Sequence, residues 1–156
     1  MEPKLEFVLE VRLMLRKPRL EIAPLPIGGS RLGVQIESGE FEGSGLKGVV
    51  RPGGGEYPHV REDGVFCFDA RYHLEADDGT VIMVNNRGYR HASPEVMERL
   101  FALREGDTVS PDEYYFRAIS LFDVPPGKHE WMGRHVFIGV GERMEVGNRV
   151  RYYKVV

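Results

Sequence analysis

Apolar and polar residues alternate with a period of two along most of this chain, which is the pattern of half-buried β-strands. Over residues 5–15, leucine, phenylalanine or valine stands at every odd position, and most of the positions between are charged. Similar runs predict further strands, bounded by glycine, proline, asparagine and aspartate. These lie at residues 31–37, 46–51, 65–76, 80–86, 114–122, 135–141 and 149–156.

One segment departs from this period. Ser93, Pro94 and Glu95 have the order of an N-cap, a first-turn proline and an acid that favours a helix N-terminus. Apolar residues follow at helical spacing between residues 96 and 103, and Gly106 ends the pattern. We therefore expect a single substantial α-helix.

Short connections between the strands favour antiparallel pairing. The Asp78-Gly79 pair predicts a tight hairpin between residues 65–76 and 80–86. About eight such strands either close into a barrel or form a sandwich. Glycines within the strand-like runs, at positions 43, 45, 48, 139 and 141, favour a barrel, because a closing sheet bends at such positions. The expected fold is one all-β domain over residues 1–156, an antiparallel barrel with one short helix.

Composition narrows the class of protein. The 156 residues contain one cysteine, Cys67, which excludes an internal disulfide and a multi-cysteine zinc site. A net charge of −3 gives no general attraction to nucleic acid or anionic membranes. The five histidines lack metal-ligand spacing, and the glycines at 43–48 precede a strand instead of the helix that a dinucleotide fingerprint needs. We expect a cytoplasmic protein without metal or cofactor.

A set of motifs spread over nearly the whole chain resembles the domain-of-unknown-function family 3237. They are Gly-Glu-Phe-Glu-Gly-x-Gly-Leu-Lys-Gly-x-Val (39–50), Pro-Gly-Gly (52–54), Asp-Ala-Arg-Tyr (69–72), Asn-Arg-Gly (86–88), Pro-Glu-Val-Met (94–97), Tyr-Tyr-Phe-Arg (114–117) and Phe-x-Gly-x-Gly (137–141). The resemblance implies a calycin-like barrel, similar to the barrels of lipocalins and allene oxide cyclase. It also implies cofactor-free cyclisation in natural-product pathways for some members, without naming catalytic residues.

The first candidate site consists of Asp69, Arg71, Arg117 and Tyr115. Even positions of the strand at 65–76 are apolar and odd positions mostly polar, so the odd set faces either solvent or a ligand-filled lumen. Arg117 shares its face with apolar residues, and a buried arginine needs a carboxylate such as Asp69. A structural ion pair and a catalytic group that polarises a carbonyl or phenol both fit this pattern.

A second set of candidates concerns substrate binding. Glu40 and Phe41 stand beside the glycines at which a backbone can approach a ligand, although a solvated turn carboxylate is the alternative for Glu40. Trp131, the only tryptophan, either caps a pocket mouth or plugs the barrel. Asn86 completes the set at the end of a predicted strand.

Three functions remain open at this point. The first is a cofactor-independent cyclase or isomerase that acts on a small organic molecule in the barrel. The second is a carrier that binds such a molecule unchanged, and the third is a structural barrel with a filled lumen. A homodimer is also expected, because long strands and one helix leave apolar surface to cover.

Overall fold

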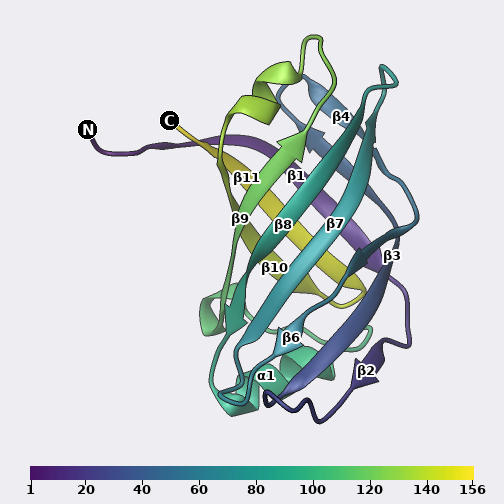
Figure 1. The fold of residues 1–156 in the computed structure, drawn as a ribbon, viewed down its shortest axis with the longest axis vertical. Helices are drawn as coiled ribbons and strands as arrows, with labels where there is room; N and C mark the ends of the chain where they lie inside the picture. Colours follow the sequence, from purple (N-terminus) through teal and green to yellow (C-terminus); the bar gives the residue numbers. More distant parts are fainter.

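The computed structural model describes residues 1–156, and its strands wind into a closed antiparallel barrel (Figure 1). Around the ring the order is β1-β11-β10-β9-β8-β7-β4-β3, and β1 pairs with β3 to close it. The predicted all-β barrel with one short α-helix is thereby confirmed. The elements are β1 (Leu5–Leu15), β2 (Leu20–Ile22), β3 (Ser30–Gly43), β4 (Leu46–Val50), β5 (Gly54–Glu56), β6 (His59–Val60), β7 (Phe66–Ala76), β8 (Val81–His91), α1 (Pro94–Phe101), η1 (Pro111–Glu113), β9 (Tyr115–Asp123), η2 (Glu130–Arg134), β10 (Phe137–Met144) and β11 (Gly147–Val155).

Three short strands share one position in the barrel wall. Each of β4, β5 and β6 pairs with β3 on one side and with β7 on the other. Glu56, the last residue of β5, lies opposite Val34 and Ala70. Directly opposed residues point to the same side of a sheet. Because Ala70 faces the interior, this register turns the Glu56 carboxylate inward.

The end of the barrel near η2 is a packed core. Nineteen buried residues meet there, and the rings of Phe137 and Tyr152 pack edge-on against Phe122, with centroids 4.7 and 5.4 Å away. The hydroxyl groups of Tyr72 and Tyr152 lie 2.5 Å apart and satisfy one another. In this half the barrel is filled by its own side chains, as eight-stranded barrels commonly are.

The helix α1 lies across the opposite end (Figure 1). Its start follows the predicted pattern, since the Ser93 hydroxyl accepts a hydrogen bond from the Val96 amide at 3.4 Å. Met97 and Leu100 are buried and join a second core cluster that includes Phe66. Burial of this apolar stripe holds the helix against the barrel.

Two glycines show why the wall needs residues without side chains. A Cβ atom at Gly48 would lie 2.0 Å from the carbonyl oxygen of Glu75, and one at Gly141 would lie 2.6 Å from the ring of Phe116. Gly45 has a φ of +71° in the turn between β3 and β4. The glycine-rich segment is therefore a β-hairpin with strands on both sides.

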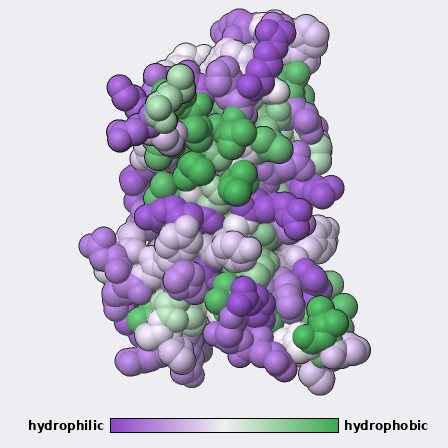
Figure 2. All heavy atoms as spheres, turned by 60° about the vertical axis from the view of Figure 1, so that its left-hand side comes forward, coloured by the Kyte–Doolittle hydropathy of each residue, from purple (hydrophilic) through white to green (hydrophobic).

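An apolar row crosses the outer surface of four strands. Ile119, Ile138, Tyr153 and Phe7 are successive register partners on β9, β10, β11 and β1. Ile119 is 62% exposed and Phe7 47% exposed. Figure 2 shows an apolar patch on the upper half of the molecule, bordered by hydrophilic residues. A continuous exposed patch of this kind is typical of an interaction surface.

The structure changes one boundary that matters for function. The predicted strand at 80–86 is longer and runs to His91, so Arg90 lies in β8 and not in a loop before the helix. The polar side chains of Asn86 and Arg90 point inward, which breaks the apolar alternation on which the prediction depended. None of the helices is long and apolar enough to cross a membrane.

Candidate functional site

The outer face of β7 carries the predicted pair Asp69 and Arg71. Even positions of β7 are buried, so the odd positions face solvent. The Asp69 carboxylate lies 3.6 Å from the Arg87 guanidinium and 4.0 Å from that of Arg71. The polar set therefore does not line the lumen, and surface ion pairs of this kind contribute about 0–1 kcal/mol to stability.

Arg117 and Tyr115 also lie outside. The Arg117 guanidinium is 5.4 Å from the centroid of the Tyr115 ring and donates to the carbonyl oxygen of Phe116 at 3.0 Å. The interpretation that Arg117 is buried and pairs with Asp69 is wrong, because β9 turns its even positions inward. The apolar residues that share its face belong to the exposed patch. A role for these residues in ligand handling stays a prediction.

The predicted substrate-binding residues are dispersed. Glu40 is exposed and lies 3.6 Å from Arg12, whereas Phe41 is buried in the core near η2. Trp131 is partly buried and packs against that same core. Asn86 is buried and accepts a hydrogen bond from the Ser120 hydroxyl at 2.6 Å. None of these residues lines the interior cavity described next.

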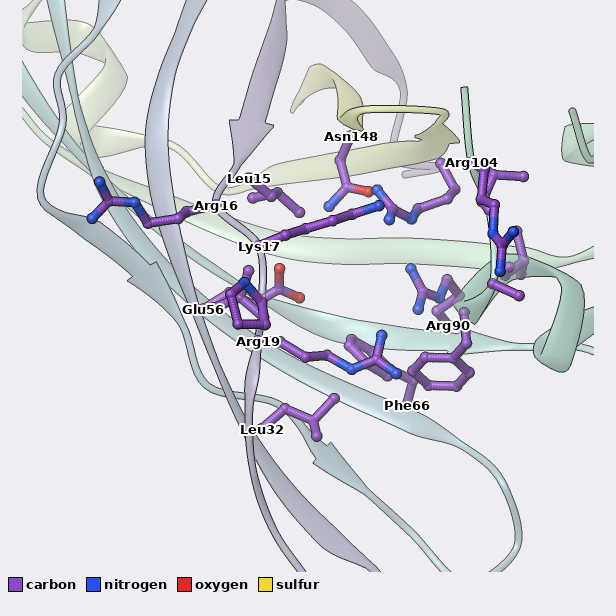
Figure 3. A pocket seen from close by; sticks show the side chains of 17 residues that line it. Leu15, Arg16, Lys17, Arg19, Leu32, Glu56, Phe66, Arg90, Arg104 and Asn148 are labelled. Carbon is purple, nitrogen blue, oxygen red and sulfur yellow. The ribbon is translucent and has the colours of Figure 1, made fainter. Parts of the chain in front are cut away.

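A cavity of about 410 Å³ opens inside the barrel at the end covered by α1 (Figure 3). Strands, the C-terminal part of α1 and the segment that follows β1 all contribute to its wall. The lining residues are Leu15, Arg16, Lys17, Pro18, Arg19, Leu32, Val34, Glu56, Phe66, Arg90, Leu100, Phe101, Ala102, Leu103, Arg104, Arg143 and Asn148. The volume is within the range of about 300–1,000 Å³ that is usual for small-molecule sites.

Glu56 is the only acidic residue in the cavity wall. Its side chain is buried, and its carboxylate points toward the middle of the pocket (Figure 3) without an ion pair or hydrogen bond to another residue. Burial raises the pKa of Glu56, and the positive charges of Arg90 and Arg143 oppose that rise. A carboxyl group in this setting can exchange a proton nearer to neutral pH than an exposed glutamate.

Arg90 lies opposite on β8. Its guanidinium is 4.3 Å from the centroid of the Phe66 ring and 5.6 Å from that of Phe101, and it forms no hydrogen bond with another residue. Burial lowers the pKa of Arg90 to about 10, and the charge of Glu56 partly offsets this effect. Arg90 therefore remains a cation at neutral pH, held in place by aromatic stacking.

Arg143 and Asn148 face each other across the hairpin of β10 and β11. The Arg143 guanidinium donates to the carbonyl oxygen of Gly147 at 2.7 Å, and burial lowers the pKa of Arg143. Asn148 is buried, and its Oδ1 atom has no hydrogen-bond partner. Buried polar atoms are nearly always paired, so this unpaired oxygen in the cavity wall is a candidate for a ligand contact.

Positive charge dominates this cavity. Six of its lining residues are arginine or lysine, against the single carboxylate of Glu56, although the whole chain has a net charge of −3. Figure 3 shows Lys17 reaching toward Asn148, while Arg19 extends toward the aromatic side of the pocket. The fold thus concentrates basic groups in one hollow.

Sequence reasoning missed the residues of the cavity. Glu56 follows a run of glycines that reads as a turn, and Arg90 stands in a segment that reads as a loop. One signal was available in the sequence: Asn86 and Arg90 stand at even positions, like the buried residues Ile82 and Val84 of the same strand, and therefore point to the same side of the sheet. Nowhere does the structure bring together three or more histidine, cysteine, aspartate or glutamate side chains that could hold a metal ion.

Comparison with known proteins agrees with this architecture. The model of the family described as "Protein of unknown function (DUF3237)" matches residues 3–155. The chain belongs to this family. A UPF0311 protein of Clostridium acetobutylicum is 34% identical over 154 residues, which are 99% of this chain and 95% of that protein. The family resemblance predicted from the motifs is therefore confirmed.

Solved structures show the same barrel. A beta-barrel like protein from Acinetobacter baumannii superposes with a TM-score of 0.85 at 30% identity, covering 100% of this chain and 98% of that one. An enzyme from Penicillium herquei has a TM-score of 0.73 at 20% identity, covering 100% and 96%. The second likeness establishes a common fold.

Proposed function

We propose that this protein binds a small organic molecule in the interior cavity and, without a cofactor, isomerises or cyclises it by moving one proton. The observation that carries the proposal is Glu56, a buried carboxyl group that no other residue neutralises by direct contact. It faces the cavity together with the buried cation Arg90 and the half-buried cation Arg143. Reactions that pass through an enolate need a group that transfers a proton and a positive charge that stabilises the oxyanion.

The chemistry follows from these groups. The Glu56 carboxylate would remove a proton from a carbon next to a carbonyl group, and the electron pair would move to the carbonyl oxygen. Arg90 and Arg143 would stabilise that oxyanion. The protonated Glu56 would then return the proton to a different carbon, which gives an isomer of unchanged mass.

Cyclisation needs the same parts. A substrate hydroxyl group would add to a conjugated double bond while Glu56 accepts the hydroxyl proton, and the resulting enolate would take that proton back on carbon. The apolar wall, which includes Phe66 and Leu100, would hold the two reacting ends together. The Penicillium herquei protein with this barrel is an enzyme, so the fold is compatible with catalysis.

Proton transfer can be tested without a known substrate. Purified protein would be incubated in D₂O with a panel of 1,3-diketones and hydroxyaryl enones, and products would be followed by mass spectrometry and chromatography. We expect deuterium incorporation or a change of retention time with wild-type protein, and a loss of at least a hundredfold in rate with Glu56→Gln. Glu75→Gln, on the outer face of β7, is the matched control.

A carrier is the alternative function. In that case a compound would bind with neither deuterium exchange nor altered retention, and Glu56→Gln would affect affinity alone. Equal rates for wild-type protein and Glu56→Gln would refute the assignment of Glu56 as the proton carrier.

A further inference from the structure

The polar groups of the cavity specify the charge of its ligand. Arg90 is 5% exposed and donates to no other residue, so its terminal nitrogens remain available to a ligand. Asn148 is 6% exposed and has an unpaired Oδ1 atom. A guanidinium without a partner calls for an anionic oxygen, and an unpaired amide oxygen calls for a hydroxyl or N–H donor.

The net charge of the whole cavity also favours an anionic ligand. Lys17, Arg19 and Arg104 line the cavity in addition to the buried Arg90 and the half-buried Arg143. Burial leaves the charge of Arg90 weakly screened, whereas the exposed side chains of Lys17, Arg19 and Arg104 add a positive field that water screens more strongly. A neutral ligand would leave them uncompensated, whereas an anion would offset part of their repulsion.

The apolar part of the wall specifies the body of the ligand. Phe66 and Phe101 stand beside the cations, and Leu32, Leu100 and Leu103 complete this side. The rings are already stacked with guanidinium groups, since Arg19 lies 4.9 Å from the Phe101 centroid. Flat conjugated molecules fit between such surfaces. A cavity of about 410 Å³ holds a body of one or two rings.

We propose that the ligand is a flat organic anion, a hydroxyaryl carboxylate or its vinylogous equivalent, whose anionic oxygens contact Arg90 and Arg143 while its hydroxyl group donates to Asn148. This inference rests on the proposed function, because it concerns the same cavity. It adds the chemical class of the molecule and the end by which it is held.

The test compares an acid with its neutral counterpart in equilibrium binding. The probes are 1-hydroxy-2-naphthoate and 1-hydroxy-2-naphthamide, titrated calorimetrically into the whole protein, with inorganic phosphate as a third probe. We expect the acid to bind at least tenfold more tightly than the amide and than phosphate. Arg90→Met should weaken the acid at least tenfold and the amide by less than threefold, and Arg87→Met, on the outer face of β8, should change neither.

Glu56→Gln should change the affinity for the acid in the direction opposite to Arg90→Met. Removal of the only carboxylate in the cavity should tighten binding of the acid by threefold or more, whereas the same variant loses turnover under the proposed function. The inference would be overturned if the protein bound the acid no more tightly than the amide or than phosphate. It would also be overturned by unchanged binding in a folded Arg90→Met, or by binding of none of the three probes.

The two proposals fail in distinguishable ways. Tight binding of the acid without any Glu56-dependent deuterium exchange refutes the enzymatic function and leaves the anion site standing. Glu56-dependent exchange on neutral enones, together with no binding of the acid, refutes the anion site and leaves the proton transfer standing.

Discussion

Replacement of Arg90 by methionine is expected to stabilise the barrel while it destroys the anion site. Burial lowers the pKa of Arg90 from its ordinary value to about 10, which corresponds to roughly 3 kcal/mol against the charged form at about 1.4 kcal/mol per pKa unit. Arg90 is charged at neutral pH in both the native and the unfolded protein. The free energy of unfolding is therefore lowered by the full cost of burying this charge. Methionine keeps an unbranched apolar stem without the charge.

One favourable contact is lost in the same variant. The Arg90 guanidinium stacks on the Phe66 ring at 4.3 Å, an interaction of about 1 kcal/mol. The net gain is therefore about 2 kcal/mol, or a rise in Tm of about 6 °C for a chain of this size. Arg90 also holds down the pKa of Glu56, so without it the ionised carboxylate is less favourable in the fold. The gain should consequently be larger at pH 5.5 than at pH 8.

Urea unfolding followed by tryptophan fluorescence at both pH values measures this effect. Arg87→Met is the control, because Arg87 is exposed on the same strand and pairs with Asp69 at 3.6 Å, and its free energy of unfolding should change by less than about 1 kcal/mol. If Arg90→Met instead loses more than 1 kcal/mol, Arg90 is a structural partner of Glu56, and the reasoning that the cavity is prepared for a ligand is refuted.

Three further predictions concern Glu56, the surface ion-pair residues and the outer apolar row. Because the pKa of Glu56 is raised in the fold, wild-type stability falls as pH rises from about 4.5 through the native pKa. The Tm of Glu56→Gln should therefore equal that of wild type near pH 4 and exceed it at pH 8. A lower Tm for Glu56→Gln than for wild type at pH 8 would contradict this. Because Asp69 and Arg117 are exposed, Asp69→Ala and Arg117→Ala should each change the free energy of unfolding by less than about 1 kcal/mol, and loss of folding in either would restore a structural ion pair. The apolar row through Ile119 and Ile138 predicts a homodimer, with a mass of twice 17.7 kDa in light scattering. Ile119→Lys should convert this dimer to a monomer. A wild-type mass of 17.7 kDa would contradict the prediction.

The regular parts of the fold could be predicted because they are local. Alternation predicted where the long strands lie, although β3 continues to Gly43 beyond its predicted end at residue 37, and the Ser93 cap predicted the start of the helix. The short strands β2, β5 and β6 were missed, since two or three residues carry no periodicity. The end of β8 was missed because polar residues occupy its inward positions, where the alternation rule expects apolar ones.

The candidate site could not be assembled from the same signals. On β9 the apolar odd positions suggested a buried face, yet Ile119 and Leu121 lie on an exposed patch and Arg117 lies with them. Periodicity shows which residues share a face of a strand, but not which face the barrel encloses.

The sequence alone determined the number of long strands, their antiparallel order through short turns, the single helix and the family. These properties depend on neighbouring residues, whose preferences add along the chain. Only the tertiary structure decided which face points inward and which distant residues meet. Glu56, Arg90 and Arg143 belong to three strands, and only the closure of the barrel brings them to one cavity. Their chemistry also arises there, because burial, and not residue type, changes the pKa of each group.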